Sequence, residues 1–179
     1  MSFLDRIAAA VTPAASDEAR ANARRDIEVL AIKEPWIKPI VDQHKEIEAG
    51  FEAAHAAPSV DAVERLSTIL TGHANAEEAV LYPDIADQSS KTHAGMAYEE
   101  HAMTKIQLAK LKDLPPGTKE WGEKLEHIRS AVAQHIYQEE DSWLPDLAEE
   151  MSAERKARLL ERYNEEYDRY CGNTVSIAG

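Results

Sequence analysis

Apolar and polar residues alternate at steps of three and four along four long stretches of the chain. Because an α-helix turns once every 3.6 residues, this spacing predicts four helices, each with one apolar stripe. We expect them over residues 36–56, 60–87, 91–113 and 118–149. Their inward stripes comprise Ile40, His44, Ile47 and Phe51; Val63, Leu66, Leu70, His73, Glu77 and Val80; Ala97, His101, Thr104, Leu108 and Leu111; and Leu125, Ile128, Val132, His135, Glu139 and Ser142.

Turn-forming residues separate these four stretches. Pro58-Ser59 stands before the second, Ser89-Ser90 before the third, and a Pro-Pro-Gly-Thr run ending at Thr118 opens the fourth. Short connections make consecutive helices antiparallel neighbours. The predicted fold is therefore all-α: an up-down-up-down antiparallel four-helix bundle with extra N-terminal and C-terminal helices.

Shorter helical patterns flank the bundle. Residues 3–11 and 17–30 are expected to form two accessory helices, the second with Ser16 as its N-cap. Residues 153–170 form a last pattern, which is expected to pack either onto its own bundle or onto a second copy of the chain as a homodimer. The predicted divisions are an N-terminal accessory segment (1–34), the bundle (35–150), and a C-terminal helix and tail (151–179).

The net charge of −13 narrows the choice of partners. A nucleic acid or an anionic membrane would repel so acidic a chain, so small ligands or cations are favoured. No apolar run approaches the roughly 20 residues of a membrane span, and Asp5 and Arg6 interrupt the apolar start, unlike a secretory signal. With one cysteine, Cys171, no internal disulfide can form. We expect a cytoplasmic protein.

Polar residues interrupt every inward stripe. Burying an imidazole or carboxylate without a partner costs several kcal/mol, so something should compensate these residues. Counting about 1.5 Å per residue from the turns places most of them in one layer of the bundle. His135 matches that layer only if the preceding loop continues to about Gly122. The six residues are His44, His73, Glu77, His101, His135 and Glu139.

An internal duplication supports the same set. When residues 73–88 are laid on residues 135–150, six of 16 positions are identical, including the histidine and the glutamate four residues later. Residues four apart project from the same helix face, so each pair can address one ion or two neighbouring ions. Two such pairs and two lone histidines would give each of two metals two imidazoles and a share of two carboxylates, with positions left open for water or a small ligand.

The motifs D-Q-H44, H73-x-x-x-E77-E-x-x-L-Y-P83, E-H101-x-x-x-K105 and H135-x-x-x-E139-E-x-x-W-L-P145 resemble those of the hemerythrin-like HHE cation-binding domain over about residues 39–160. The resemblance implies that the six residues are metal ligands and that Glu77 and Glu139 bridge. It implies two non-heme iron ions joined by an oxo or hydroxo bridge, although zinc or manganese also accepts such ligands.

The chain departs from the oxygen-carrying hemerythrins at two of these positions. Lys105 stands where those proteins have a second histidine, and Glu139 replaces their final aspartate with a different spacing. Their asymmetric dioxygen site is therefore not carried over to this chain.

Other polar residues have more ordinary expected roles. His55, His93 and His127 lie outside the layer and are interpreted as solvated or locally hydrogen-bonded. Tyr98 is expected to be a packed tyrosine, with donation to a metal-bound ligand as the alternative. Lys105 is expected to extend to solvent, or else to hydrogen-bond a bound anion.

Two further pairs of residues follow the proposed ligands. Glu78 and Glu140 point about 100° away from them around the helix, so they are predicted to be surface groups or groups that orient a ligand histidine. Pro83 and Pro145 are expected to kink or end their helices one turn past each glutamate.

Two functions from different classes fit this pattern. The first is a binding or sensing module for dioxygen, nitric oxide or another small oxidant, or a holder of iron. The alternative is a di-iron redox enzyme acting on peroxide or nitric oxide. A third interpretation is a bundle held together by structural zinc. No H-E-x-x-H motif is present, and no nucleophile stands beside a base.

Overall fold

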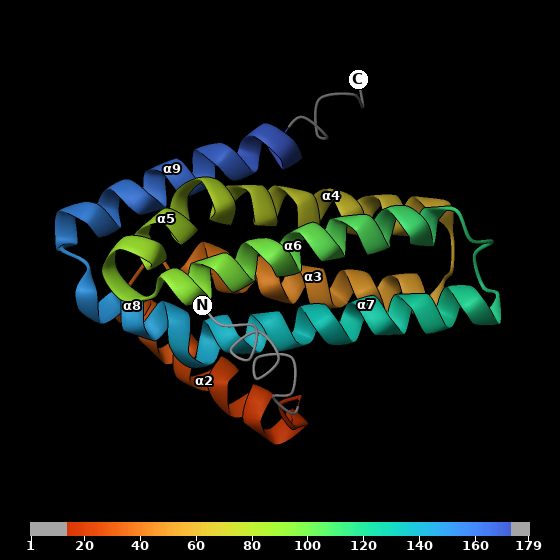
Figure 1. Ribbon diagram of the computed structural model, residues 1–179, viewed down its shortest axis with the longest axis horizontal. Coiled ribbons are helices and arrows are strands. Elements are labelled where there is room, and N and C mark those ends of the chain that lie inside the picture. The colour runs from red at the N-terminus through yellow and green to blue at the C-terminus, as the bar shows by residue number, and fades with distance from the viewer. Residues whose placement is uncertain (1–13, 173–179) are drawn as a thin grey trace.

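Helices make up all the regular structure in residues 14–172, the part of the chain that the computed structural model describes (Figure 1). The predicted helix at 3–11 lies outside these residues. The longer helices are α2 (Asp17–Lys33), α3 (Lys38–Ala56), α4 (Val60–Ala76), α6 (Lys91–Lys112), α7 (Lys119–Gln138), α8 (Leu144–Glu150) and α9 (Ala153–Cys171). The short elements are α5 (Tyr82–Asp84) and the π-helical segments η1 (Glu77–Leu81), η2 (Ile85–Ser89) and η3 (Glu139–Trp143).

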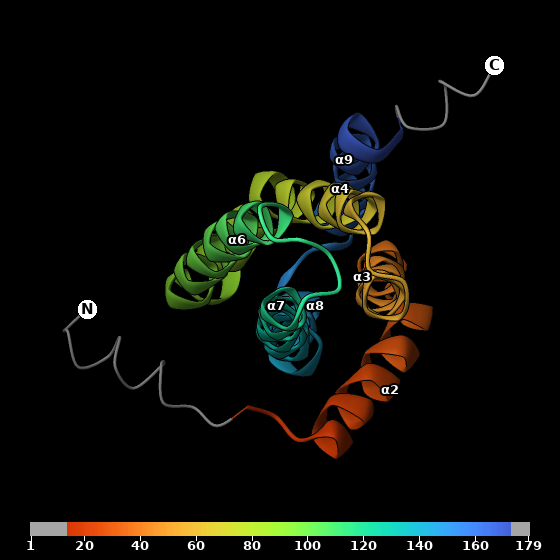
Figure 2. The same ribbon diagram turned by 90° about the vertical axis from the view of Figure 1, so that its right-hand side faces the viewer.

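Four helices, α3, α4, α6 and α7, lie side by side around a common core (Figures 1 and 2). Helix α3 packs against α4 and α7, and α6 packs against the same two helices. The residues of the predicted inward stripes are buried, apart from Thr104 and Ser142, which are half-buried. The all-helical fold and the inward faces of the four helices are therefore confirmed.

Side-chain caps fix where the helices begin. The hydroxyl groups of Ser16, Ser59, Ser90, Thr118 and Ser152 each accept a hydrogen bond from a backbone N–H three residues later. The predicted cap at Ser16 is confirmed. Thr118 caps α7, which begins at Lys119 close to the predicted start, so the loop does not continue to Gly122 as residue counting required for His135. Residue counting failed there because packed helices can be staggered relative to their connecting loops.

The predicted continuous helices 60–87 and 118–149 are each interrupted by a π-helical turn. The Tyr82 N–H donates to the Glu77 carbonyl, and the Leu144 N–H donates to the Glu139 carbonyl, five residues back in both cases. Each wide turn ends just before a proline, Pro83 or Pro145, whose ring would clash with the carbonyl four residues back in a regular α-helix. The expected disruption is present, but as a widened turn rather than a helix end.

Helices α2 and α9 lie outside the bundle (Figure 2). Helix α2 packs against α3, α7, η3 and α8, with Ile27 buried. Helix α9 packs along α4 and η1 through the buried residues Leu159 and Tyr163. The C-terminal pattern thus covers its own bundle. None of the described helices combines the length and apolar character needed to cross a lipid bilayer.

The core divides into two apolar clusters along the bundle. One includes Trp36 and Val41, and the other includes Ile47 and Phe51, so in α3 the change falls at His44. The polar layer therefore lies between two apolar regions, where interactions between charges are little weakened by water.

Candidate metal centre

All six predicted site residues converge in the middle of the bundle and are buried, none more than 6% exposed. They form two groups that could each hold a cation. Within each group the candidate ligand atoms lie within 4.8 Å of one another. The first group is His44, His73, Glu77 and Glu139, and the second is Glu77, His101 and His135. Helices α3, α4, α6 and α7 thus all contribute, and Glu77 belongs to both groups.

The Nε2 atoms of all four histidines face the centre. His44 Nε2 lies 3.2 Å from Glu139 Oε2, and His73 Nε2 lies 3.2 Å from Glu77 Oε2. His135 Nε2 lies 3.4 Å from the other Glu139 oxygen. In each His and Glu pair four residues apart, the two side chains therefore point toward the same part of the centre. Both carboxylate oxygens of Glu139 have an imidazole nearby.

Several of these inward atoms have no hydrogen-bond partner although they are buried. They are His44 Nε2, His73 Nε2, Glu77 Oε1 and Glu139 Oε2. An unsatisfied buried polar atom costs about 1–3 kcal/mol, so four at one point are unusual in a native protein. A cation would satisfy all four at once. The residues present therefore fit a metal ion.

The outward nitrogens are all engaged, which fixes the ring orientations. His44 Nδ1 donates to Glu140 Oε1 at 2.7 Å, and His135 Nδ1 donates to Glu100 Oε2 at 2.7 Å. Metal-binding histidines typically donate their second ring N–H to such an acceptor, which leaves Nε2 as the lone-pair donor.

The other two histidines follow the same rule. His101 Nδ1 donates to Glu78 Oε1 at 3.2 Å, and His73 Nδ1 donates to Gln43 Oε1 at 3.0 Å. Glu78 and Glu140 thus orient candidate ligand histidines, in line with the second of their two predicted roles. The sequence interpretation missed Gln43 and Glu100, although each directly precedes a candidate ligand in the chain.

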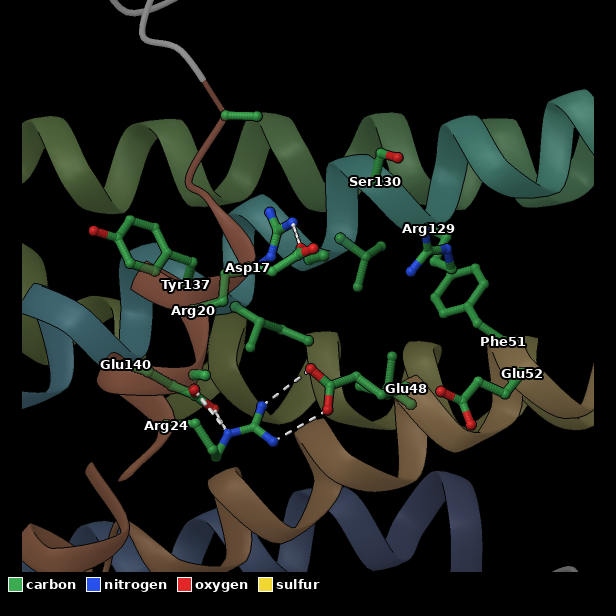
Figure 3. A pocket seen from close by; sticks show the side chains of 16 residues that line it. Asp17, Arg20, Arg24, Glu48, Phe51, Glu52, Arg129, Ser130, Tyr137 and Glu140 are labelled. Carbon is green, nitrogen blue, oxygen red and sulfur yellow. Dashed lines mark hydrogen bonds and ion pairs between the residues drawn. The ribbon is translucent and has the colours of Figure 1, made fainter. Parts of the chain in front are cut away.

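Helices α2 and α9 both support the centre from outside the bundle. Arg24 of α2 donates from Nε to both carboxylate oxygens of Glu140 at 2.8 Å and also pairs with Glu48 (Figure 3). From α9, the Tyr163 hydroxyl donates to Gln43 at 2.7 Å. Glu140 and Gln43, which orient His44 and His73, are therefore fixed in turn by α2 and α9.

Burial and close charges act on the site in opposite directions. Burial alone would lower the pKa of His44, but Glu139 and Glu140 outweigh it and raise that pKa to about 9. For Glu139, burial raises the pKa, but His135 and His44 bring it well below its usual range. Burial and the nearby Glu139 charge keep the pKa of Glu77 well above its usual range.

The pKa values of His73 and His101 shift in the opposite direction to that of His44. Burial lowers the pKa of His73, with a smaller contribution from His44. Burial also lowers the pKa of His101, despite its contact with Glu78. Without metal the site therefore carries a mixture of protonated and neutral groups rather than four imidazolium cations.

Sequence reasoning missed Tyr82, whose hydroxyl lies inside the centre. This oxygen is 3.0 Å from His101 Nε2 and 3.2 Å from His135 Nε2. It is also 3.2 Å from Glu77 Oε2 and 3.1 Å from Glu139 Oε1. The available signal was its place in the L-Y-P motif after Glu77, which was quoted only as part of a family pattern.

The other tyrosine and lysine considered from the sequence lie beside the centre rather than in it. The Tyr98 hydroxyl donates to the Glu78 carbonyl at 2.7 Å, and its ring meets the edge of Tyr82. Lys105 Nζ contacts Glu78 at 2.8 Å and Asn75 at 3.0 Å. Tyr98 is 40% exposed, so the predicted packed role holds only for its ring contact with Tyr82. Lys105 is engaged in an ion pair with Glu78 instead of reaching the candidate ligands.

The three histidines placed outside the layer are not part of the centre. His55 and His127 are exposed on their helices, as expected. His93 is half-buried, and its ring stacks on Trp143 with centroids 5.5 Å apart. The predicted solvated or hydrogen-bonded role is therefore wrong for His93, whose buried Nδ1 has no hydrogen-bond partner and whose ring packs instead.

A cavity of about 290 Å³ borders the centre between α4, α6 and α7. At its inner end it meets His73, His101 and His135, and it also reaches Met103, which is 54% exposed. Its remaining lining is largely apolar, with Leu70, Ala74, Leu108, Val132 and Ile136 among the residues. The cavity therefore connects the candidate ligands with the protein surface.

These features define a helical bundle with a buried histidine–carboxylate centre suited to cations. The chain belongs to the hemerythrin family: residues 37–147 match the hemerythrin HHE cation binding domain. The family and the buried groups together indicate a metal-binding site.

A comparison with curated proteins gave a partial match. The chain is 29% identical over 86 residues to a protein of Nostoc sp. (strain PCC 7120 / SAG 25.82 / UTEX 2576) named "DNA nickase". The match covers 48% of this chain and 24% of that protein, so the chain spans about a quarter of this relative. No solved structure matches the chain.

Proposed function

We propose that the chain holds two metal ions, one at each of the two donor groups, with Glu77, which belongs to both groups, shared between them. The observation that carries the proposal is the convergence of four buried donor atoms that have no hydrogen-bond partner. A single four-coordinate ion would leave part of a six-residue set unused. We further infer that the four helices alternate in direction, because short loops join α3 to α4 and α6 to α7.

We propose iron as the metal and a small apolar oxidant, dioxygen or nitric oxide, as the ligand that the module binds or senses. When bound, iron supplies a redox-active cation with affinity for such molecules. The chain's own contribution is the cavity, because its largely apolar lining, which also includes Glu100, Thr104, Lys105 and Gln134, favours a small apolar molecule over water.

A redox enzyme acting on peroxide or nitric oxide is the second candidate. Tyr82 favours it, because its hydroxyl lies against both glutamates and could move a proton at the site. Turnover of added peroxide or nitric oxide by the iron-loaded protein separates this candidate from a binding module. A bundle stabilised by zinc is a third candidate, and manganese accepts the same ligands.

We propose no nucleic-acid partner for this chain, despite the name of the Nostoc relative. The charge of −13 opposes binding to a polyanion, and the match covers only 24% of that protein. For the same reason we propose no anionic membrane partner, and we retain a cytoplasmic location as a proposal.

Metal analysis combined with optical spectra of the protein, purified anaerobically and then exposed to air, tests the proposal. We expect close to two iron ions per chain and new charge-transfer absorption after exposure to air. One tightly held ion per chain after reconstitution would contradict the dinuclear site. Two zinc ions with no spectral change would favour the structural role.

A further inference from the structure

The Tyr82 hydroxyl lies among the candidate ligands because of the π-helical turn η1. Tyr82 follows Glu77 by five residues, which on an α-helix would place the two side chains about 140° apart. In η1 the Tyr82 N–H instead bonds to the Glu77 carbonyl, so the wider turn brings residue 82 back close to the face that carries Glu77. Both side chains then project from the same face, toward the centre.

Every recorded hydrogen-bond partner of this hydroxyl is a candidate ligand atom, and the residue is 0% exposed. A cation at His101 and His135 would occupy the nitrogen lone pairs that the hydroxyl now faces. The phenol oxygen is already within 3.2 Å of both nitrogens, so it is close to any ion that they share. Once the glutamate oxygens that the hydroxyl also contacts bind metal as well, coordination keeps this oxygen satisfied.

The two donor groups are unequal without Tyr82. The group around His44 and His73 has four residues, whereas the group around His101 and His135 has three. We propose that the Tyr82 phenol oxygen is the fourth protein ligand of the metal at His101 and His135, and of that metal only. This inference rests on the two-metal function proposed above.

The internal repeat explains why only one metal gains this ligand. In the alignment of residues 73–88 with 135–150, Leu144 stands at the position of Tyr82. Leu144 is buried and also follows a π-helical turn, η3, but it has no donor atom. The same position in the two halves of the fold therefore supplies an oxygen in one half and a hydrocarbon in the other.

The proposed bond has a simple chemical balance. The phenol O–H bond breaks, the oxygen–metal bond forms, and the proton leaves to solvent. No electron is transferred in this step, and no co-reactant is needed. The resulting phenolate adds one negative charge to those of Glu77 and Glu139, which offsets more of the charge of two buried cations and favours the ferric state.

The test uses iron-loaded, air-oxidised full-length protein and the variant Tyr82→Phe, with Tyr98→Phe as the matched control. Tyr98 contacts the Tyr82 ring, but its hydroxyl bonds to a backbone carbonyl and not to a ligand. In the wild type and Tyr98→Phe we expect a visible phenolate-to-iron absorption band and tyrosinate ring modes in resonance Raman spectra excited within it. Both signals should be lost in Tyr82→Phe.

Metal affinity provides a second measurement. Tyr82→Phe should bind the less tightly held ion at least about tenfold more weakly, while the tighter ion is unaffected. Two ferric ions in the wild type without tyrosinate modes would overturn this inference and leave the two-metal function standing. A wild type that takes up no iron would overturn the proposed function itself. One ion per chain, with Tyr82 filling the second position, would also overturn the inference.

Discussion

Removing the metals should make the stability of this protein depend strongly on alkaline pH through His44. Its pKa rises from 6.5 to about 9 in the folded chain, because contacts with Glu139 and Glu140 outweigh burial. The folded state therefore holds this proton more tightly than the unfolded chain. The resulting stability is fully present below about pH 6.5 and is lost as pH rises through about 9.

The expected size of the effect follows from the shift. One pKa unit corresponds to about 1.4 kcal/mol, so the shift in His44 from 6.5 to about 9 is worth on the order of 3 kcal/mol. The pKa of His135 is raised in the same direction and adds to the slope. Because domains unfold with only about 5–15 kcal/mol in total, such a loss should be readily measured.

Urea unfolding of chelated protein between pH 6.5 and 9.5 provides the assay. We expect the free energy of unfolding to fall across this range in the metal-free form, and to change little in the loaded form, whose imidazoles bind metal instead of protons. His44→Gln should flatten the metal-free slope, whereas His55→Gln, at an exposed position, should not. A wild-type value that stays constant or rises toward pH 9.5 would refute the reasoning.

Three further outcomes are expected. Glu77→Ala should reduce bound metal toward zero and His44→Ala toward one ion per chain, because only the carboxylate belongs to both donor groups; equal losses in elemental analysis would contradict the shared role. Loading metal-free protein at pH 7 should release protons from His44 and His135, detectable in a weakly buffered indicator solution, and uptake without release would be the contrary result. Arg24→Met should lower the free energy of unfolding by about 2–3 kcal/mol, because Glu140 is almost fully buried. A loss below about 0.5 kcal/mol in denaturant titrations would mean that this ion pair contributes little.

Most of the framework could be predicted because it depends on local spacing. Steps of three and four residues identified the inward faces of the four helices, and the serine before α2 identified its start. The same spacing, together with the repeated His and Glu pair, selected six residues that the structure brings together. Their role as ligands stays a prediction, as do the domain divisions and the small-molecule partners.

The missed features depend on backbone geometry or on contacts between distant residues. Tyr82 stands at a spacing that an α-helix would turn away from the centre, so only knowledge of the π-helical turn could include it. Arg24 meets Glu140 across 116 residues of sequence, which no periodicity reports. The level of His135 was uncertain because loop lengths do not determine how far neighbouring helices are staggered.

The parts of the chain that hold the candidate ligand histidines extend beyond the segment that matches the family. The match begins at residue 37 and ends at residue 147, whereas Arg24 lies before it and Tyr163 lies after it. A fusion or chimera that transplanted only the matched segment would carry the six candidate ligands but lose the outer supports of His44 and His73. We therefore expect that a transplanted segment would need to run from α2 to α9 to keep the contacts around His44 and His73.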